Sequence, residues 1–550
     1  MLADAPAIRE SSWMRLAVLA SSISIFGLLS WVSGCGSSDA SDDVSQVDAG
    51  VDSGKKKGSS SGEWTGDDDD DSTPGKKDAG TKPSGGLTST ALKAGDAQLI
   101  GVTTGSSPMV VYLAVQNQAL SLEAIAPTGG TPTVIATDLT GEEDIGVNGG
   151  AVWWYTGVNE AGLGTVNFWT KASGAKTAVA TGSIDGYFWA SEDGTRVAFS
   201  VNGAAKTTRV AVTSSAAPSA TAVLTDNYAL DFPTNECLPD VGFVGTTLFA
   251  AFCSVQTAGS PNSTAARIVA VDASGTVKRL DATGNANNTI ALSLDRSLWH
   301  ANKTGTKLFV IGSGASAEGR IIDVATAPAA ASTVVLESGV TDGFLLDDGS
   351  AVYTTGTVIK RGNGSGAAKT LTTAAVKAFL SRSAGGDRLL FRSLDPAGEY
   401  GLHDLRTIDT STDNQAATDL VPTASVSLEA LLNGGSHVLY RSNLAEDPSS
   451  EALLGKLEAK PIGGGTAVQL ATGSLGGLPV AGSTGVVNAA SIKDDGDGNF
   501  VLVLEHVDAV SATARAISDD VIPNAWDFIG KTFIYTRAGA TPGIYVVQLP

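Results

Sequence analysis

Carboxylate and amide side chains alternate in one short segment of the sequence, where they could bind a metal ion. Asp495, Asp497 and Asn499 occupy every second position, and oxygen ligands at such positions can converge on Ca²⁺. The place where a calcium loop carries its bidentate glutamate is held instead by His506. Ca²⁺ binding is therefore to be sought here first, although a hairpin between two strands is the favoured interpretation. No other cofactor is expected.

The residue types used for catalysis are scattered along the chain. The histidines are His300, His403, His437 and His506. None of them lies in an H-E-x-x-H motif, and no C-x-x-C pair occurs, so the spacings typical of zinc sites are missing. No Ser–His–Asp set can be read from the order of the residues either. An enzyme is not predicted, but a ring-shaped fold could still bring distant side chains together.

Two adjacent tryptophans, Trp153 and Trp154, are candidates for a ligand-binding surface. Flat aromatic rings stack on the faces of sugars, so an exposed pair would suit a glycan. Aromatic residues within β-strands usually pack in the core, which is the alternative interpretation.

Cysteine is rare, with residues at Cys35, Cys237 and Cys253. Cys35 follows an apolar segment near the start of the chain and is considered separately. Cys237 and Cys253 flank one strand and turn, and in an oxidising compartment they could form a disulfide worth about 3 kcal/mol. Two separate buried thiols are the alternative.

The first 34 residues have the pattern of an export signal. Arg15 precedes an apolar run over residues 16–32, and the small residues Ser33 and Gly34 come directly before Cys35. A basic start, an apolar stretch and a small-residue cleavage site are typical of a secretory signal peptide. Met14 would give a more compact signal and could be the true start. An uncleaved anchor helix is the alternative, but it leaves Cys35 unexplained.

The tetrapeptide from Val32 to Cys35 resembles the lipobox of bacterial lipoproteins, in which leucine is the more common first residue. This resemblance implies a mature protein that begins at Cys35 and is acylated there. Several acyl chains at about 0.8 kcal/mol per buried CH₂ give firm anchoring to a bilayer. Gly36 stands where an aspartate would favour the inner membrane, so the outer membrane is the favoured location. The side of the membrane that the protein faces stays open.

Residues 35–95 are predicted to be a lipidated cysteine followed by a disordered tether. The segment is rich in Ser, Gly, Asp and Lys, and residues 67–71 are all aspartate. Such a composition cannot bury enough apolar surface to offset the entropy of ordering. The whole chain carries 57 acidic and 36 basic residues, for a net charge of -21. This balance argues against a nucleic-acid partner, because phosphate binding needs clustered Lys and Arg.

Residues 96–550 are predicted to be all-β and repetitive. Short apolar segments follow turns that contain Gly, Asn or Asp, and an aromatic residue lies near the middle of each segment, recurring about every 47 residues. These aromatic positions are Tyr112, Trp154, Phe199, Phe249, Phe309, Tyr353, Phe391, Tyr440, Phe500 and Tyr535. Strand-only units of this length are typical of β-propeller blades.

The segment from Trp189 to Phe199 resembles the repeat core of TolB-type, WD40-like propellers. The resemblance implies a ring of four-stranded sheets and protein partners in the cell envelope. A single ring of seven or eight blades is favoured. A ring of ten blades, two smaller rings, or a series of β-sandwich domains are the alternatives.

Two classes of function follow from this reading. The first is a lipid-anchored envelope protein whose propeller is a non-catalytic platform for proteins or other ligands. The second is an extracytoplasmic hydrolase or lyase acting on glycans, with paired carboxylates at the ring axis. The first is preferred, because no spacing in the sequence supports the second. Its partners would be the bilayer, through Cys35, and envelope proteins or glycan.

Overall fold

The computed structural model of the chain describes residues from 86 onward, with several internal gaps. The described ranges are 86–116, 119–140, 144–159, 163–173, 177–184, 188–202, 207–223, 230–231, 240–253, 265–280, 290–291, 299–312, 317–327, 333–373, 379–382, 388–392, 403–447, 452–494 and 500–550. Their regular structure is almost entirely β-strand, with one 3-10 turn at Asn433–Gly435. The predicted all-β class is therefore confirmed.

The first part of the domain forms six separate antiparallel sheets, each built from strands that are consecutive in sequence. The first three contain β2 (Ala97–Val102), β3 (Val110–Gln116), β4 (Ala119–Ile125) and β5 (Thr133–Leu139); β6 (Ile145–Asn148), β7 (Ala151–Thr156), β8 (Leu163–Thr170) and β9 (Thr177–Ile184); and β10 (Phe188–Ala190), β11 (Arg196–Asn202), β12 (Thr207–Ser214), β13 (Ala217–Val223) and β14 (Leu230–Asp231). The next three contain β15 (Asp240–Val244), β16 (Thr247–Cys253), β17 (Ala265–Val271), β18 (Val277–Arg279) and β19 (Ile290–Ala291); β20 (Trp299–Ala301), β21 (Lys307–Ile311), β22 (Gly319–Asp323) and β23 (Thr333–Glu337); and β24 (Asp342–Leu345), β25 (Ala351–Thr355), β26 (Val358–Gly362) and β27 (Lys369–Thr372).

The last part of the domain forms two sheets of seven strands each. One contains β28 (Phe379–Arg382), β29 (Arg388–Arg392), β30 (His403–Asp409), β31 (Thr418–Leu432), β32 (His437–Glu446), β33 (Leu453–Pro461) and β34 (Val468–Ser474). The other contains β35 (Gly476–Pro479), β36 (Gly485–Asp494), β37 (Phe500–Asp508), β38 (Ala514–Ile529), β39 (Thr532–Arg537), β40 (Gly543–Gln548) and β1 (Ser89–Ala94). The long strands β31 and β38 each pair with the preceding hairpin along their first part and with the following hairpin along their second part.

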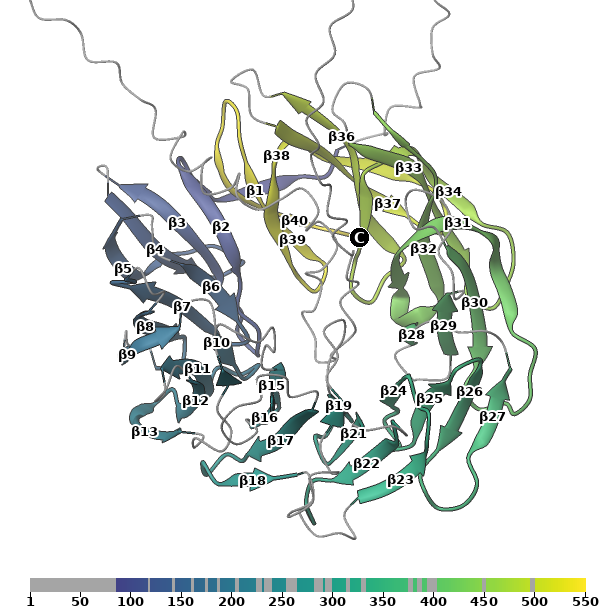
Figure 1. Cartoon of the computed structure of the whole chain (residues 1–550). Coiled ribbons are helices and arrows are strands. Elements are labelled where there is room, and N and C mark those ends of the chain that lie inside the picture. The colour runs from purple at the N-terminus through teal and green to yellow at the C-terminus, as the bar shows by residue number, and fades with distance from the viewer. Residues whose placement is uncertain are drawn as a thin grey trace, which may run out of the picture.

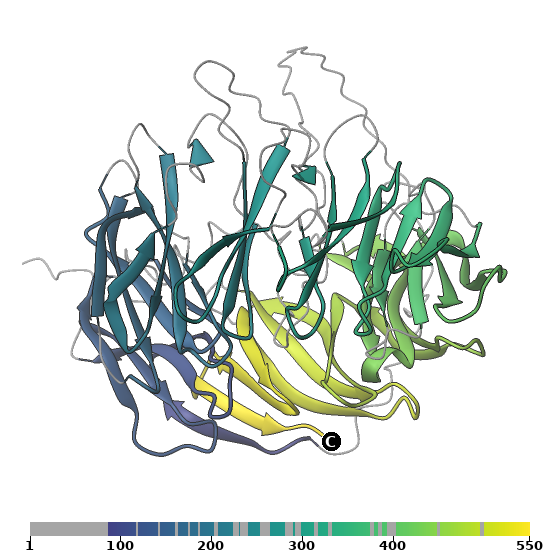
Figure 2. The ribbon, with the colours of Figure 1, turned by 90° about the horizontal axis from the view of Figure 1, so that it is seen from below.

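The sheets follow one another around a circle in sequence order, as in a β-propeller (Figure 1). Figure 2 shows the same ring from the side, with the yellow C-terminal strands between the purple first strands and the green ones. The ends of the domain meet where β1 pairs antiparallel with β40, from Ser89 opposite Val547 to Ala94 opposite Gly543. Strand β1 lies before the expected domain start at residue 96, because its pairing to β40 is long-range and leaves no local pattern.

Glycine turns place the strands as the sequence predicts. Gly149 connects β6 to β7 with a φ of 53°, a left-handed conformation that glycine adopts without steric cost. Gly150, the next residue, lies against the neighbouring turn, and a methyl group there would come within 2.3 Å of Gly194 N. Its amide donates a hydrogen bond to the Ser191 carbonyl at 2.9 Å. Turns of adjacent sheets are thus in direct backbone contact.

Most of the predicted aromatic positions fall on the second strand of a four-strand unit and are buried, as Tyr353 and Tyr535 illustrate. Phe500 is the exception: it begins β37, a third strand, and is 60% exposed. The corresponding second strand, β36, carries the fully buried Asn488, which hydrogen-bonds Ser474 and Glu505. Assigning the repeat to Phe500 was wrong because a polar residue has replaced the aromatic one in this unit.

The core is divided into clusters that lie between neighbouring units. Successive residues of a strand point to opposite faces, so each second strand contributes to two clusters: Leu248 packs toward the preceding sheet, and Phe249 toward the following one. Pairs of residues that represent the ten clusters within the described chain are Val111–Trp154, Phe168–Phe199, Val210–Leu248, Phe249–Leu308, Phe309–Tyr353, Val352–Phe391, Leu390–Tyr440, Leu439–Val486, Val487–Phe533 and Tyr112–Ile534. The last pair joins the first sheet to the last one.

Within the described part of the chain, no helix is long and apolar enough to cross a membrane. The apolar run over residues 16–32, the cleavage site and Cys35 lie outside that part.

Candidate binding pocket

A pocket of about 530 Å³ opens where turns from three successive parts of the ring meet. Its walls come from the turns β31–β32, β35–β36, β37–β38 and β38–β39, and from the last residue of the chain. The lining residues are Asn433, Gly482, Ser483, Thr484, Gly485, His506, Asp508, Ser511, Thr513, Arg515, Lys531 and Pro550. A volume of this size is in the range of small-molecule sites.

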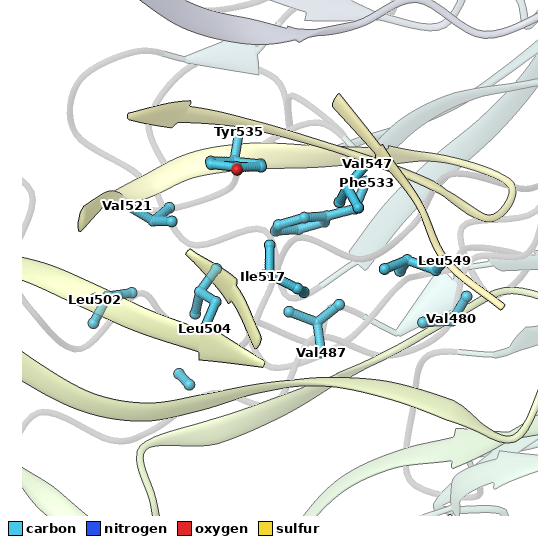
Figure 3. Packing of buried hydrophobic residues seen from close by; sticks show 11 residues of the cluster. Val480, Val487, Leu502, Leu504, Ile517, Val521, Phe533, Tyr535, Val547 and Leu549 are labelled. Carbon is cyan, nitrogen blue, oxygen red and sulfur yellow. The ribbon is translucent and has the colours of Figure 1, made fainter. Parts of the chain in front are cut away.

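The turn between β35 and β36 is fixed by hydrogen bonds and by the core beside it. The Val480 amide donates to the Gly485 carbonyl at 2.9 Å, and the Ser483 amide donates to the Val480 carbonyl at 3.2 Å. Val480 and Leu549 belong to the cluster drawn in Figure 3, where they lie together at one end of the packed side chains. The pocket therefore adjoins a well-packed core rather than resting on free loops.

The carboxylate of Asp508 accepts hydrogen bonds from neighbouring residues of the protein. Its Oδ2 accepts a hydrogen bond from Thr484 Oγ1 at 2.8 Å, and its Oδ1 accepts from the amides of Ser511 and Val510. Burial alone would raise the pKa of this carboxyl group, but the hydrogen bonds outweigh burial and lower the pKa. Asp508 thus holds two turns together, and its lone pairs are largely used inside the protein.

His506 is the buried polar group of the pocket wall. The side chain lies opposite Val487 and Arg515 in the sheet and is 3% exposed. A methyl group at Gly485 would come within 2.4 Å of His506 Nε2, so the absence of a side chain there leaves room for the ring. Burial lowers the pKa of His506; nearby Asp508 opposes this effect, whereas Arg515 and Lys531 add to it.

Neither ring nitrogen of His506 has a hydrogen-bond partner among the described residues. Buried polar groups in folded proteins are nearly always satisfied by protein or by water. The imidazole therefore has hydrogen-bonding capacity that the described protein groups leave unused, on the wall of a pocket.

Arg515 and Lys531 supply positive charge. Both side chains belong to exposed residues on the pocket wall, and neither forms an ion pair within the described part of the chain. The neighbouring carboxylate, Asp508, is instead satisfied by hydroxyl and amide donors. The cations are therefore available to an incoming anion.

The predicted tryptophan pair is separated by the sheet. Trp154 is 4% exposed and packs in the cluster between the first two sheets. Trp153 faces the other side, where its ring centroid lies 5.6 Å from that of Tyr155 and 6.0 Å from that of Phe188. The two indoles thus point into different inter-sheet cores and do not form one surface.

The other predicted sites fall outside the described residues. These are the Ca²⁺ candidate Asp495, Asp497 and Asn499, the lipidation site Cys35, and Cys237 of the proposed disulfide; Cys253 ends β16, but its side chain is also outside the description. Elsewhere in the described chain, no group of three or more His, Cys, Asp or Glu side chains is arranged to hold a metal ion.

Two carboxylates, one fully buried and one partly buried, lie on strands near the junctions between units. Glu429 of β31 is paired with Arg441 at 2.6 Å and is fully buried; burial raises its pKa against the effect of the arginine. Asp527 of β38 accepts hydrogen bonds from the amides of Phe528 and Val102, and burial raises its pKa. Glu429 Oε1 and Asp527 Oδ1 therefore have structural partners, whereas Glu429 Oε2 is buried without a hydrogen-bond partner among the described residues.

Sequence reasoning singled out His506 but gave no reason to join it to Arg515 or Lys531. The pocket residues come from four turns separated by up to about a hundred positions, and no short motif links them. The usable signal was the replacement of an aromatic by Asn488 in β36, which marks this unit as atypical.

Comparisons with known proteins show distant structural similarity only. No family model matches the chain, and no curated protein matches it. The tricorn protease matches with a TM-score of 0.26 and 9% identity over 80% of this chain and 46% of that one, so this chain spans about half of its length. The propeller domain of the Trilobed protease from Pyrococcus furiosus has a TM-score of 0.26 and 10% identity, over 59% of this chain and 97% of that one. TolB from Acinetobacter baumannii has a TM-score of 0.23 and 11% identity, over 57% and 61%. Similarities at this level carry no argument about function.

Proposed function

We propose that this chain is a lipid-anchored protein of the bacterial cell envelope, whose ring of sheets is a rigid, non-catalytic binding platform. The anchor is supported by the apolar run over residues 16–32 and by the residues Ser33, Gly34 and Cys35 that follow it. Gly36 favours the outer membrane. The segment between Cys35 and β1, which begins at Ser89, would hold the folded part away from the bilayer, where envelope proteins or glycan could reach it.

The ring itself is proposed to have ten blades. Strands β31 and β38 each serve as the last strand of one four-strand unit and the first strand of the next. Counting both roles divides each seven-stranded sheet into two units, and the core clusters between neighbours then close the circle through Tyr112 and Ile534. Closure by strands from both ends protects the sheet edges.

A binding role is favoured over a catalytic one by a single observation, the pocket around His506. It combines unpaired cations with a buried imidazole that lacks a partner, whereas its one carboxylate is used for structure. Hydrolysis of a glycan typically uses two carboxyl groups that flank the scissile bond, one as general acid and the other as general base or nucleophile. The fully buried Glu429 is instead paired through one oxygen with an arginine, and the partly buried Asp527 accepts a hydrogen bond from a backbone amide.

The anchor can be tested by labelling cells that express the chain with an alkyne analogue of palmitate. The full-length protein is expected to be labelled and to sediment with membranes, and the Cys35→Ser variant is expected to lose both properties. A matched Cys253→Ser variant should keep the label. An unlabelled full-length protein in the soluble fraction would contradict the proposal.

A further inference from the structure

We propose that the pocket around His506 binds a small hydroxylated anion, of the kind represented by sugar acids and sugar phosphates. The inference rests on the proposed binding function of the ring, but it does not depend on lipidation. It combines an available pair of cations, an unsatisfied buried imidazole and a cavity of limited size.

The charge of the pocket selects for an anion. Arg515 and Lys531 line it without ion-pair partners in the described chain, although the whole protein has a net charge of -21. Asp508 does not neutralise them by direct pairing, because its oxygens accept hydrogen bonds from Thr484, Val510 and Ser511. A guanidinium and an ammonium group together suit a carboxylate or a phosphate.

The rest of the lining selects for hydroxyl groups. A neutral imidazole has one donor and one acceptor, and both nitrogens of His506 lack partners among the described residues. Both nitrogens are covered by neighbouring atoms, so a ligand hydroxyl group would pair with one of them as the Gly485 turn adjusts around the ligand. Asn433 and the hydroxyl side chains of Ser483 and Thr513 add further polar groups to the walls. A molecule with several hydroxyl groups beside its anionic group therefore fits best.

The size of the pocket suits a small molecule. Its volume is about 530 Å³, in the range of pockets that bury a small molecule. The turns that form it are tied to the core through Val480 and Leu549, so the cavity is largely preformed.

Binding can be measured by thermal shift on the full-length protein in detergent, with glucuronate, glucose 6-phosphate, glucose and inorganic phosphate as probes at one ionic strength. A ligand that binds the folded state raises the melting temperature with its concentration. Glucuronate or glucose 6-phosphate is expected to give a saturable shift, and glucose none. The two anionic sugars distinguish a carboxylate from a phosphate preference. Inorganic phosphate alone should bind at least tenfold more weakly than the preferred sugar.

Variants identify the site. Arg515→Gln with Lys531→Gln is expected to weaken binding of the anionic sugar at least tenfold. The matched double variant Lys369→Gln with Lys493→Gln removes the same charge from exposed positions outside the pocket lining and should leave binding unchanged. If both double variants weaken binding equally, or if neither sugar anion shifts the melting temperature, the proposal is wrong.

His506 provides a second readout that a purely structural role would not give. His506→Leu removes a buried, unpaired polar group, so the ligand-free protein should melt at the same or a higher temperature. The same variant should lose affinity for the sugar anion at least fivefold, while His506→Gln should retain most of it. A loss of stability without loss of affinity would overturn the role of His506. The Cys35→Ser chain should bind like the unaltered one, so failed lipidation would leave this test intact.

Discussion

Two buried arginines lie in the interior of the ring, but their partners differ. Arg196 Nη1 reaches the next sheet and donates to the carbonyls of Thr246, Val271 and Asp272, at 2.7, 3.1 and 2.5 Å. Arg441 of β32 stays within its own sheet: it pairs with the buried Glu429, which lies beside Gly476 of the next sheet, and it also donates to the carbonyls of Leu453 and Ser474.

The difference determines what each junction leaves behind when its arginine is lost. Without Arg196, the junction retains uncharged carbonyls at turns. Without Arg441, it retains a carboxylate that has no access to solvent. A buried charge without a partner is far more costly than an unpaired carbonyl. The sequence gives both residues the same chemistry, and their surroundings give them different importance.

The largest effect is expected from Arg441→Ala, which should lower the free energy of unfolding by about 3–5 kcal/mol. Glu429 would then be buried alone, with a pKa already raised by burial. Urea unfolding measures the change. The double variant Glu429→Leu with Arg441→Leu removes both charges and should recover most of the loss. If the double variant is as unstable as the single one, packing rather than charge holds this junction.

A smaller effect is expected from Arg196→Ala, about 1.5–3 kcal/mol, because charge-assisted hydrogen bonds to three carbonyls are lost while no opposite charge is stranded. Arg196→Lys keeps the charge, but its more flexible side chain would have to bring the ammonium group to the position of Nη1, so it should give part of the loss. The comparison of the two junctions fails if Arg196→Ala destabilises the protein more than Arg441→Ala does under the same urea conditions.

A junction made by backbone alone sharpens the contrast further. Gly150→Ala places a methyl group 2.3 Å from Gly194 N, and relieving that overlap should cost about 1–3 kcal/mol. Gly463→Ala is the control, since a methyl group there meets nothing within 4 Å. Thermal unfolding of the two variants should differ. Equal melting temperatures would mean that these turns move apart freely.

The smallest effect is expected at Asp527, a carboxylate at the closing junction that accepts backbone hydrogen bonds and forms no ion pair with any described residue. Burial raises its pKa in the folded state, so the folded protein holds the proton to higher pH than the unfolded chain. The folded state therefore keeps the full stability linked to protonated Asp527 below a pH of about 4, the pKa of an unfolded aspartate. This stability is lost as the pH rises through the folded pKa.

Asp527→Asn should remove this dependence. Relative to the unaltered protein, the variant should be more stable at pH 7 than at pH 4 by about 1 kcal/mol or less. Urea unfolding at the two pH values measures the difference. A variant whose pH dependence matches that of the unaltered protein would show that Asp527 titrates normally in the folded ring.

The features that could be predicted from the sequence are those set by residues close together in the chain. Strand class, glycine turns and buried aromatics such as Tyr353 follow from local alternation, because a residue two positions away shares the same face. The repeat position in β36 was not predicted, because Asn488 replaces the aromatic residue there. The burial of Asn488 depends on hydrogen bonds to Ser474 and Glu505. A polar residue carries no periodic signal of being buried.

The pocket could not be predicted for a related reason. Arg515 and His506 face each other across one hairpin, and a sequence pattern can suggest such a pair. Lys531 and Asn433 reach the same cavity only because neighbouring units stack. The order of the units around the ring, and the double role of β31 and β38, decide which turns meet, and neither is encoded in a short segment.

The pairing of β1 with β40 has a mechanical meaning. Any tension applied to the chain before Ser89 arrives first at the strand whose hydrogen bonds to β40 hold the circle shut. A pull in line with β1 would strain all of those bonds together, whereas a sideways pull would open them one after another from Ser89. The ring should therefore resist force strongly along β1 and open more easily under force across it, because the segment before Ser89 pulls directly on the strand pair that closes the ring.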